Sequence, residues 1–364
     1  MSISRVTSPD DPALALLCKG LAAGAAEIDR TGRWPADQLR LCAEASVFEW
    51  FLDSRHGGQG WPTVDAVRGY MALASACLTT TFILTQRTGA CRRIAASHNK
   101  SLQQRLLPGL IDGSLFSTVG ISHLTTSRRH LGRPVLAAEE TSTGFRLDGM
   151  SPWVTGGAAA GVIVMAASLV ENGAPTDREL VLAVPMNLAG ISVDEPFPLV
   201  ALTASSTGAV RLDGVEVPRE NLIAGPAANV MASAIGGSTG GYETSALALG
   251  LAKAAIDFLA AEMAKRPDLT AAHDALAVEH SELVDDLVAL VRGDDHCTKE
   301  SIRHRANTFV LRATQAALSA AKGTGYVAGH PAGRWCREAL FFLVWSCPQP
   351  VAAANLCLLA GIGD

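Results

Sequence analysis

The spacing of apolar residues divides the chain into three stretches, of which the first covers residues 1–112. Apolar side chains recur there every three to four positions, which predicts amphipathic helices. The first helix is expected to begin at Asp10-Asp11-Pro12, because a carboxylate can cap free amides and proline suits a first turn, and to end at Thr31-Gly32. Further helices are predicted after Trp34-Pro35 and over residues 64–77, 81–97 and 100–111. We therefore expect residues 1–112 to form an all-helical domain.

The second stretch, residues 113–225, has a hydrophobic period near two. Short runs rich in β-branched residues lie between glycines and prolines, which predicts strands. These runs cover residues 117–121, 135–139, 145–147, 162–170, 180–184 and 210–217. Because no helical pattern separates them, we expect an antiparallel β-domain.

Helical spacing returns in the third stretch, residues 226–364. The pattern predicts long helices over residues 242–265, 271–291, 298–321 and 333–345. Four long helices with short connections are typical of an up-and-down bundle. The predicted fold class is therefore α+β, with an N-terminal all-helical domain, a central antiparallel β-domain and a C-terminal four-helix bundle.

Composition narrows the functional classes. The 364 residues carry a formal net charge of −5, and the basic residues are scattered, so neither a nucleic-acid-binding stripe nor a polybasic membrane patch is expected. Apolar runs are interrupted before they reach the length of a membrane span, and the N-terminus lacks the pattern of a signal peptide. The eight cysteines are widely spaced, without a Cys-x-x-Cys pair, which favours reduced thiols in a cytoplasmic protein and predicts no metal site.

The segment Gly144–Gly157 carries the most specific candidate chemistry. Asp148-Gly149 between apolar residues predicts a hairpin turn, because glycine accepts positive φ angles. Strand alternation would then place Trp153 and Thr155 on one face. An indole beside a hydroxyl suits a flat heteroaromatic ligand, through stacking and a hydrogen bond. The alternative is a core tryptophan beside a solvated threonine.

A second motif, Gly236–Gly240, matches the Gly-x-Ser-x-Gly pattern of hydrolases. That motif requires a strand before it and a helix after it. The residues before it are alanine-rich and helical in pattern, so we interpret these glycines as a flexible helix entry.

Five segments in order along the chain resemble motifs of one family. His56-Gly57-Gly58-Gln59-Gly60 resembles an "e-x-G-G-x-G" loop, and the segment Leu147–Thr155 resembles "l-n-G-x-k-x-W-i-T". Residues 25–35, 215–222 and 323–338 resemble its opening helix junction, the exit from its β-domain and its late "G-G-x-G-y... R-x-x-R-D" segment. Together they resemble the acyl-CoA dehydrogenase superfamily over most of the chain.

The resemblance implies an FAD-binding oxidoreductase that forms a homotetramer or homodimer through its C-terminal bundle. Trp153, Val154 and Thr155 would contact the flavin, with Trp153 along the ring and Thr155 donating to its redox-active edge. Ser127 lies in the loop that corresponds to the family's "T-E-x-x-x-G-S-D" segment. Further cofactor contacts are implied for three residues of the bundle: Arg266, which would reach the pyrophosphate of a partner's FAD, and Gly323 and Gly325, which would let a neighbouring subunit's cofactor approach the backbone.

The chain departs from the family at the catalytic base. Family dehydrogenases remove an α-proton with a glutamate, whose position here falls at Trp345-Ser346-Cys347-Pro348, without a carboxylate. Ser346 cannot act as a base near neutral pH without a partner that takes its proton. Some relatives carry the glutamate on the first helix of the bundle, which makes Glu243 the candidate base. The alternative is a helix-starting carboxylate, favoured by the helix dipole.

Three functional hypotheses follow from these observations. The first is an FAD-dependent oxidoreductase that acts on an acyl thioester, either acyl-CoA or a carrier-bound acyl group, or on a related small substrate. The second is a flavin-dependent monooxygenase of the same fold, since such relatives lack the glutamate. The third is a non-catalytic homologue that serves as a binding or assembly protein.

Overall fold

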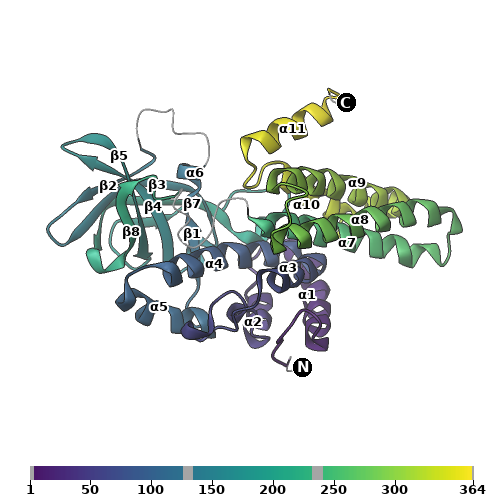
Figure 1. Ribbon diagram of the computed structural model, residues 1–364, viewed down its shortest axis with the longest axis horizontal. Coiled ribbons are helices and arrows are strands. Elements are labelled where there is room, and N and C mark those ends of the chain that lie inside the picture. The colour runs from purple at the N-terminus through teal and green to yellow at the C-terminus, as the bar shows by residue number, and fades with distance from the viewer. Residues whose placement is uncertain (1–3, 126–133, 232–240, 363–364) are drawn as a thin grey trace.

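The computed structural model describes residues 4–125, 134–231 and 241–362, and it has the three parts that the sequence predicts. In Figure 1 the β-sheet lies at one end of the molecule, the C-terminal helices lie at the other, and the N-terminal helices run along one side of both. The predicted fold class is confirmed, with one correction to the sheet.

Caps set the ends of the N-terminal helices. Asp11 accepts a hydrogen bond from the Ala13 amide at the start of the first helix (2.9 Å), and Gly32 ends that helix in the left-handed region at φ 63°. The N-terminal elements are α1 (Pro12–Thr31), α2 (Ala36–Glu44), η1 (Val47–Glu49), η2 (Ser54–His56), α3 (Thr63–Ala76), α4 (Leu78–Ala96) and α5 (Lys100–Asp112).

The central part forms one eight-stranded sheet in the order β6-β7-β3-β2-β4-β5-β8, with β1 paired to β4. Its elements are β1 (Ser117–Gly120), α6 (Ser122–Thr125), β2 (Leu136–Glu140), β3 (Gly144–Thr155), η4 (Gly157–Ala159), β4 (Val162–Glu171), β5 (Ala174–Pro185), β6 (Ile191–Val193), η5 (Thr203–Ser205), β7 (Thr207–Pro218), η6 (Arg219–Asn221) and β8 (Leu222–Ala228).

The sheet is mixed, which corrects the prediction of an antiparallel domain. β4 pairs in parallel with both β1 and β2, while the other pairs are antiparallel. The prediction was wrong on this point because it took the lack of a helical pattern to exclude parallel pairing. Here the strand pair β2–β3 lies between β1 and β4 in the chain and serves as the crossover.

The predicted hairpin turn at Asp148-Gly149 is also wrong, because both residues lie inside the continuous strand β3. The pairing of β3 with β7 shifts register between Leu147 and Gly149, which marks a β-bulge. Gly149 has φ 125°, and a Cβ atom there would lie 2.3 Å from the Val135 carbonyl oxygen. The glycine thus serves a bulge with close backbone contact, for the same reason that it suits a turn.

The C-terminal part contains the four predicted helices and one more. Its elements are α7 (Tyr242–Met263), η7 (Pro267–Leu269), α8 (Thr270–Arg292), α9 (Lys299–Gly325), α10 (Pro331–Ala339), η8 (Leu340–Leu343) and α11 (Gln349–Leu359). The last predicted helix is divided into α10 and η8, and α11 was not predicted. Among the described helices, only α7 is long and apolar enough to cross a membrane, but 72% of that stretch is buried inside the protein, as expected for the central helix of a bundle.

Close packing of α3 against α7 joins the N-terminal helices to the bundle. A Cβ atom at Gly250 of α7 would lie 2.4 Å from the Met71 carbonyl oxygen of α3, so only glycine permits this approach. One apolar core runs through both helical parts and includes Ala201 and Leu202 of the β-domain. A second lies among the strands of the sheet, and a third packs the sheet against α4 and α5. All eight cysteines are free thiols, as predicted.

Candidate functional site

A chain of three buried hydroxyl groups lies where β3 ends beside β7. The Oγ1 atoms of Thr155 and Thr207 are 3.0 Å apart, and the Oγ atom of Ser205 lies 2.8 Å from Thr207 Oγ1. Three hydroxyls carry three hydrogens, and these two bonds use two of them. One hydroxyl hydrogen is therefore left for an acceptor from outside the chain of three.

Trp153 lies two residues before Thr155 and keeps half of its surface exposed. It is 50% exposed, its ring centroid lies 4.7 Å from that of Phe197, and the two rings are inclined by 53°. Val154 is buried in the core of the sheet. The alternative of a core tryptophan beside a solvated threonine is therefore wrong, since Thr155 is only 4% exposed. A large aromatic surface on a rigid strand is available to a flat ligand.

His123 adds a buried acceptor on the short helix α6, which packs against β3. Its Nε2 atom lies 2.8 Å from the Ala166 carbonyl oxygen, and its buried Nδ1 atom has no partner. Because a carbonyl oxygen only accepts, Nε2 carries the hydrogen and Nδ1 is left as an acceptor. Burial lowers the pKa of His123, which favours this neutral form. Ser127 lies outside the described residues, as does the Gly236–Gly240 motif.

Arg337 connects the three parts of the chain through hydrogen bonds to Asp29 and Val200. From α10 its Nη1 and Nη2 atoms donate to Asp29 Oδ1 and Oδ2 of α1, at 3.1 and 2.6 Å, and Nη1 also donates to the Val200 carbonyl oxygen at 3.1 Å. The segment that follows Val200 leads into η5, which contacts α1 and α4 and carries Ser205. We call the contacts between Arg337, Asp29 and Val200 the three-part clasp.

Glu338, the neighbour of Arg337, is a buried carboxyl group. It is 3% exposed, and its Oε1 atom lies 3.6 Å from Arg334 Nε. Burial raises the pKa of Glu338 to about 7, although the nearby Arg334 opposes the shift. The sequence placed both residues in a family motif but gave no sign of this burial.

The candidate base Glu243 forms an ion pair. It lies in the first turn of α7, where its Oε1 atom accepts a hydrogen bond from Arg92 Nη1 of α4 at 2.6 Å, and both side chains are partly buried. Sequence patterns missed this contact because 151 residues separate the two side chains. One carboxylate oxygen is thus already engaged by a cation.

At the usual position of the base, the structure has aromatic rings and a partly buried serine. The Phe341 and Trp345 rings are stacked with centroids 5.0 Å apart, and Phe82 of α4 meets both at its edge. Ser346 follows with φ 46°, a left-handed backbone that is uncommon for serine. No carboxylate lies in this segment.

The structure brings Arg266 and Gly323 to the same end of the bundle, on a different part of the chain from Trp153. Arg266 Nη1 donates to the Ala320 carbonyl oxygen at 2.7 Å, near the end of α9. Gly323 has open space where a Cβ atom would lie, whereas Gly325 is packed against Ala321 and Leu318. Their contact with a neighbouring subunit's cofactor stays a prediction.

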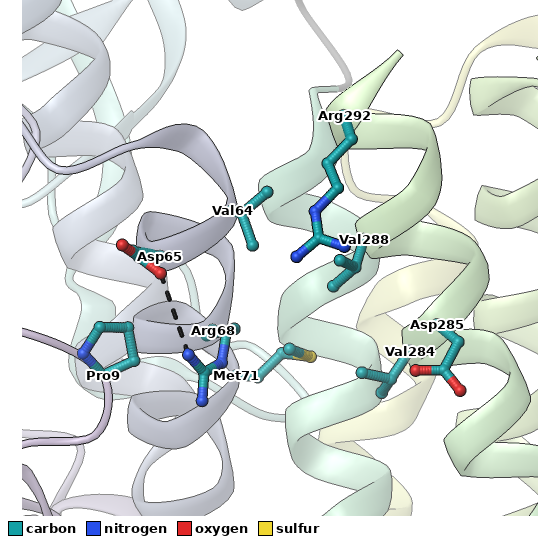
Figure 2. A pocket seen from close by; sticks show the side chains of 9 residues that line it. All are labelled: Pro9, Val64, Asp65, Arg68, Met71, Val284, Asp285, Val288 and Arg292. Atoms are coloured by element: carbon teal, nitrogen blue, oxygen red, sulfur yellow. Dashed lines mark ion pairs between the residues drawn. The ribbon is translucent and has the colours of Figure 1, made fainter. Parts of the chain in front are cut away.

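A groove of about 420 Å³ lies elsewhere, between α3 and α8. Figure 2 shows apolar side chains on both sides of it, with Val64 and Met71 from α3 and Val288 from α8, and Arg292 reaching from α8 toward Val64. Arg68 at its rim is paired with Asp65 (3.9 Å). None of the predicted site residues lines this groove.

Comparisons with known proteins agree with the fold. Residues 11–114 match the family described as acyl-CoA dehydrogenase, N-terminal domain. The chain is similar to the short-chain specific acyl-CoA dehydrogenase of Clostridium acetobutylicum, with 24% identity over 86% of this chain and 87% of that protein. It is also similar to the probable acyl-CoA dehydrogenase YngJ of Bacillus subtilis, with 22% identity over 66% of this chain and 63% of that protein.

Two solved structures extend the similarity of the fold over nearly the whole chain. A glutaryl-coenzyme A dehydrogenase in complex with glutaryl-CoA has a TM-score of 0.81, with 18% identity over 97% of this chain and 96% of that one. The dibenzothiophene monooxygenase TdsC of Paenibacillus sp. A11-2 has a TM-score of 0.76, with 16% identity over 96% of both chains. Residues 11–114 thus match an acyl-CoA dehydrogenase N-terminal domain, and the fold of the chain is similar to that of acyl-CoA dehydrogenases over nearly its whole length.

Proposed function

We propose that the protein is an FAD-dependent oxidoreductase that acts on an acyl thioester or a related small substrate. The observation that carries this proposal is the half-exposed indole of Trp153 next to a buried hydroxyl chain that has one hydrogen to spare. The names of the relatives, acyl-CoA dehydrogenases, support the same class of reaction and substrate.

The residues present fit a flavin. Trp153 offers an aromatic face, Thr155 offers a hydroxyl donor, and His123 Nδ1 offers an acceptor for a ring N–H group. Bound FAD would supply the hydride chemistry. The chain's own part is to orient the ring through these contacts, while the three-part clasp holds the domains that surround it.

The ion pair of Glu243 with Arg92 favours a second candidate reaction, monooxygenation. Removal of an α-proton requires a base, but one oxygen of Glu243 is already engaged by Arg92, and the segment around Ser346 has no carboxylate. A flavin monooxygenase does not need that base. The similarity of the fold to a dibenzothiophene monooxygenase is consistent with this alternative.

Spectroscopy of the purified protein tests the proposal. We expect the protein to be yellow as isolated or after incubation with FAD and gel filtration. Anaerobic acyl-CoA should bleach a dehydrogenase, whereas a monooxygenase should turn over only with oxygen and a separate flavin reductase. A protein that takes up no FAD would refute both reactions and favour the non-catalytic homologue.

A further inference from the structure

Helix α9 carries a buried guanidinium group without a counter-ion. Arg303 is 4% exposed, and no carboxylate among the described residues pairs with it. Burial lowers the pKa of Arg303 to about 10. Burial of a charged guanidinium without an acidic partner destabilises the folded protein. The position of Arg303 therefore suggests that a partner comes from outside the chain.

Two of its three nitrogens have structural partners. Nε donates to Asn307 Oδ1 at 3.0 Å, and Nη2 donates to the Trp345 carbonyl oxygen at 2.7 Å. The third, Nη1, is buried with no acceptor. Since Nη1 and Nη2 are bonded to the same carbon, the idle nitrogen lies beside the segment Trp345–Pro348.

That segment is partly exposed along its whole length. Ser346 and Cys347 are only partly buried, and the Cys347 thiol lies within electrostatic reach of Arg303. A second donor without a partner lies where the next residue of α9 contacts α11. Asn355 of α11 accepts a hydrogen bond from His304 Nδ1 at 2.8 Å, while its own Nδ2 is buried without a partner.

We propose that Arg303 and the segment Trp345–Pro348 form a binding site for a small carboxylate. The carboxylate oxygen accepts from Arg303 Nη1 and neutralises the guanidinium. Only one guanidinium nitrogen is free and only one positive charge is unpaired, which suits a singly charged carboxylate better than a phosphate dianion. In the family that the chain resembles, this segment carries a catalytic carboxylate. Here the segment has no carboxylate and lies beside an unpaired guanidinium, so the carboxylate comes from the ligand. The proposal rests on these contacts alone and does not require bound flavin.

Alkylation of Cys347 reports on the site without any substitution. We expect sodium acetate to slow the reaction of Cys347 with iodoacetamide in a saturable manner, as read by peptide mass spectrometry. Cys357, exposed on α11, serves as the internal reference and should react at an unchanged rate. Equal protection by sodium chloride at the same ionic strength, or none by acetate, would overturn the proposal. Stronger protection by inorganic phosphate than by acetate would overturn the assignment to carboxylates.

Substitution on α9 supplies the second test. Arg303→Gln removes the charge and Nη1, while its shorter side chain places an amide near the position of Nε, where it can still donate to Asn307 Oδ1. The acetate concentration for half protection should then rise at least tenfold. Arg305→Gln removes a charge from the same helix, where Arg305 pairs with Asp286, and should leave protection unchanged. Equal acetate dependence in both variants would contradict the site. If Arg303→Gln does not fold, the wild-type comparison of acetate with chloride still decides.

Discussion

Replacement of the buried Glu338 by glutamine should remove part of the pH dependence of stability. The pKa of this carboxyl group is raised by burial from 4.5 to about 7. Below the lower value the group is neutral in both states. Between the two values the unfolded chain releases a proton that the folded chain keeps, so stability falls as pH rises. Above the folded value the loss is complete.

The size of the effect follows from the shift. Each pKa unit corresponds to about 1.4 kcal/mol, so the free energy of unfolding should fall by about 2–3 kcal/mol between about pH 5 and pH 8 through this group alone. In Glu338→Gln the side chain is neutral at every pH, and this component disappears. Relative to wild type, the variant should therefore gain about 2–3 kcal/mol over the same interval.

Urea unfolding followed by circular dichroism at both pH values measures this difference. Contributions of the other titrating groups cancel when the variant is compared with wild type. Glu300→Gln, which changes an exposed carboxyl at the start of α9, is the control and should leave the pH dependence unchanged. Parallel pH profiles for wild type and Glu338→Gln would refute the assignment of a raised pKa to this buried group.

Three further substitutions test other parts of the account. Asp29→Asn weakens the three-part clasp and should lower the free energy of unfolding by about 1–2 kcal/mol, a value reduced because Arg337 is partly exposed; an unchanged urea midpoint would contradict this. Gly149→Ala adds strain and a clash with the Val135 carbonyl, and should cost at least about 2 kcal/mol, whereas Gly173→Ala, with φ 76° and open space around it, should cost less. Glu243→Gln should abolish exchange of the substrate α-proton if Glu243 is the base, and full exchange activity would eliminate it from that role.

The sequence predicts the local elements well where local chemistry decides them. The start of α1 at Asp11-Pro12 and its end at Gly32 follow from capping groups, so the bounds could be read from the residues. The bulge at Gly149 could not, because a positive φ angle serves a turn and a bulge equally. Helix α11 was missed because its apolar residues lie on all sides of the helix and form no single hydrophobic face. Only Val351 and Asn355 of this helix are buried.

The site residues likewise fall into those that the sequence predicts and those that only the fold brings together. Trp153 and Thr155 were found because they are close in the sequence and stand in a recognisable motif. Asp29 and Arg337 are 308 residues apart, and their contact exists only once the three parts of the chain are assembled. The idle nitrogen of Arg303 is likewise a product of packing, since a helical arginine gives no sign in the sequence that it will be buried.

Flavin binding at Trp153 is the central claim, and an equilibrium titration with FAD tests it most directly. Changes in flavin absorption and fluorescence would be followed for wild type, Trp153→Ala and Val278→Ala, the last being an exposed apolar residue on α8. We predict saturable binding by wild type and Val278→Ala, and binding about tenfold weaker in Trp153→Ala through the loss of aromatic contact. Wild-type protein that binds no FAD, or equal affinity in all three proteins, would contradict it.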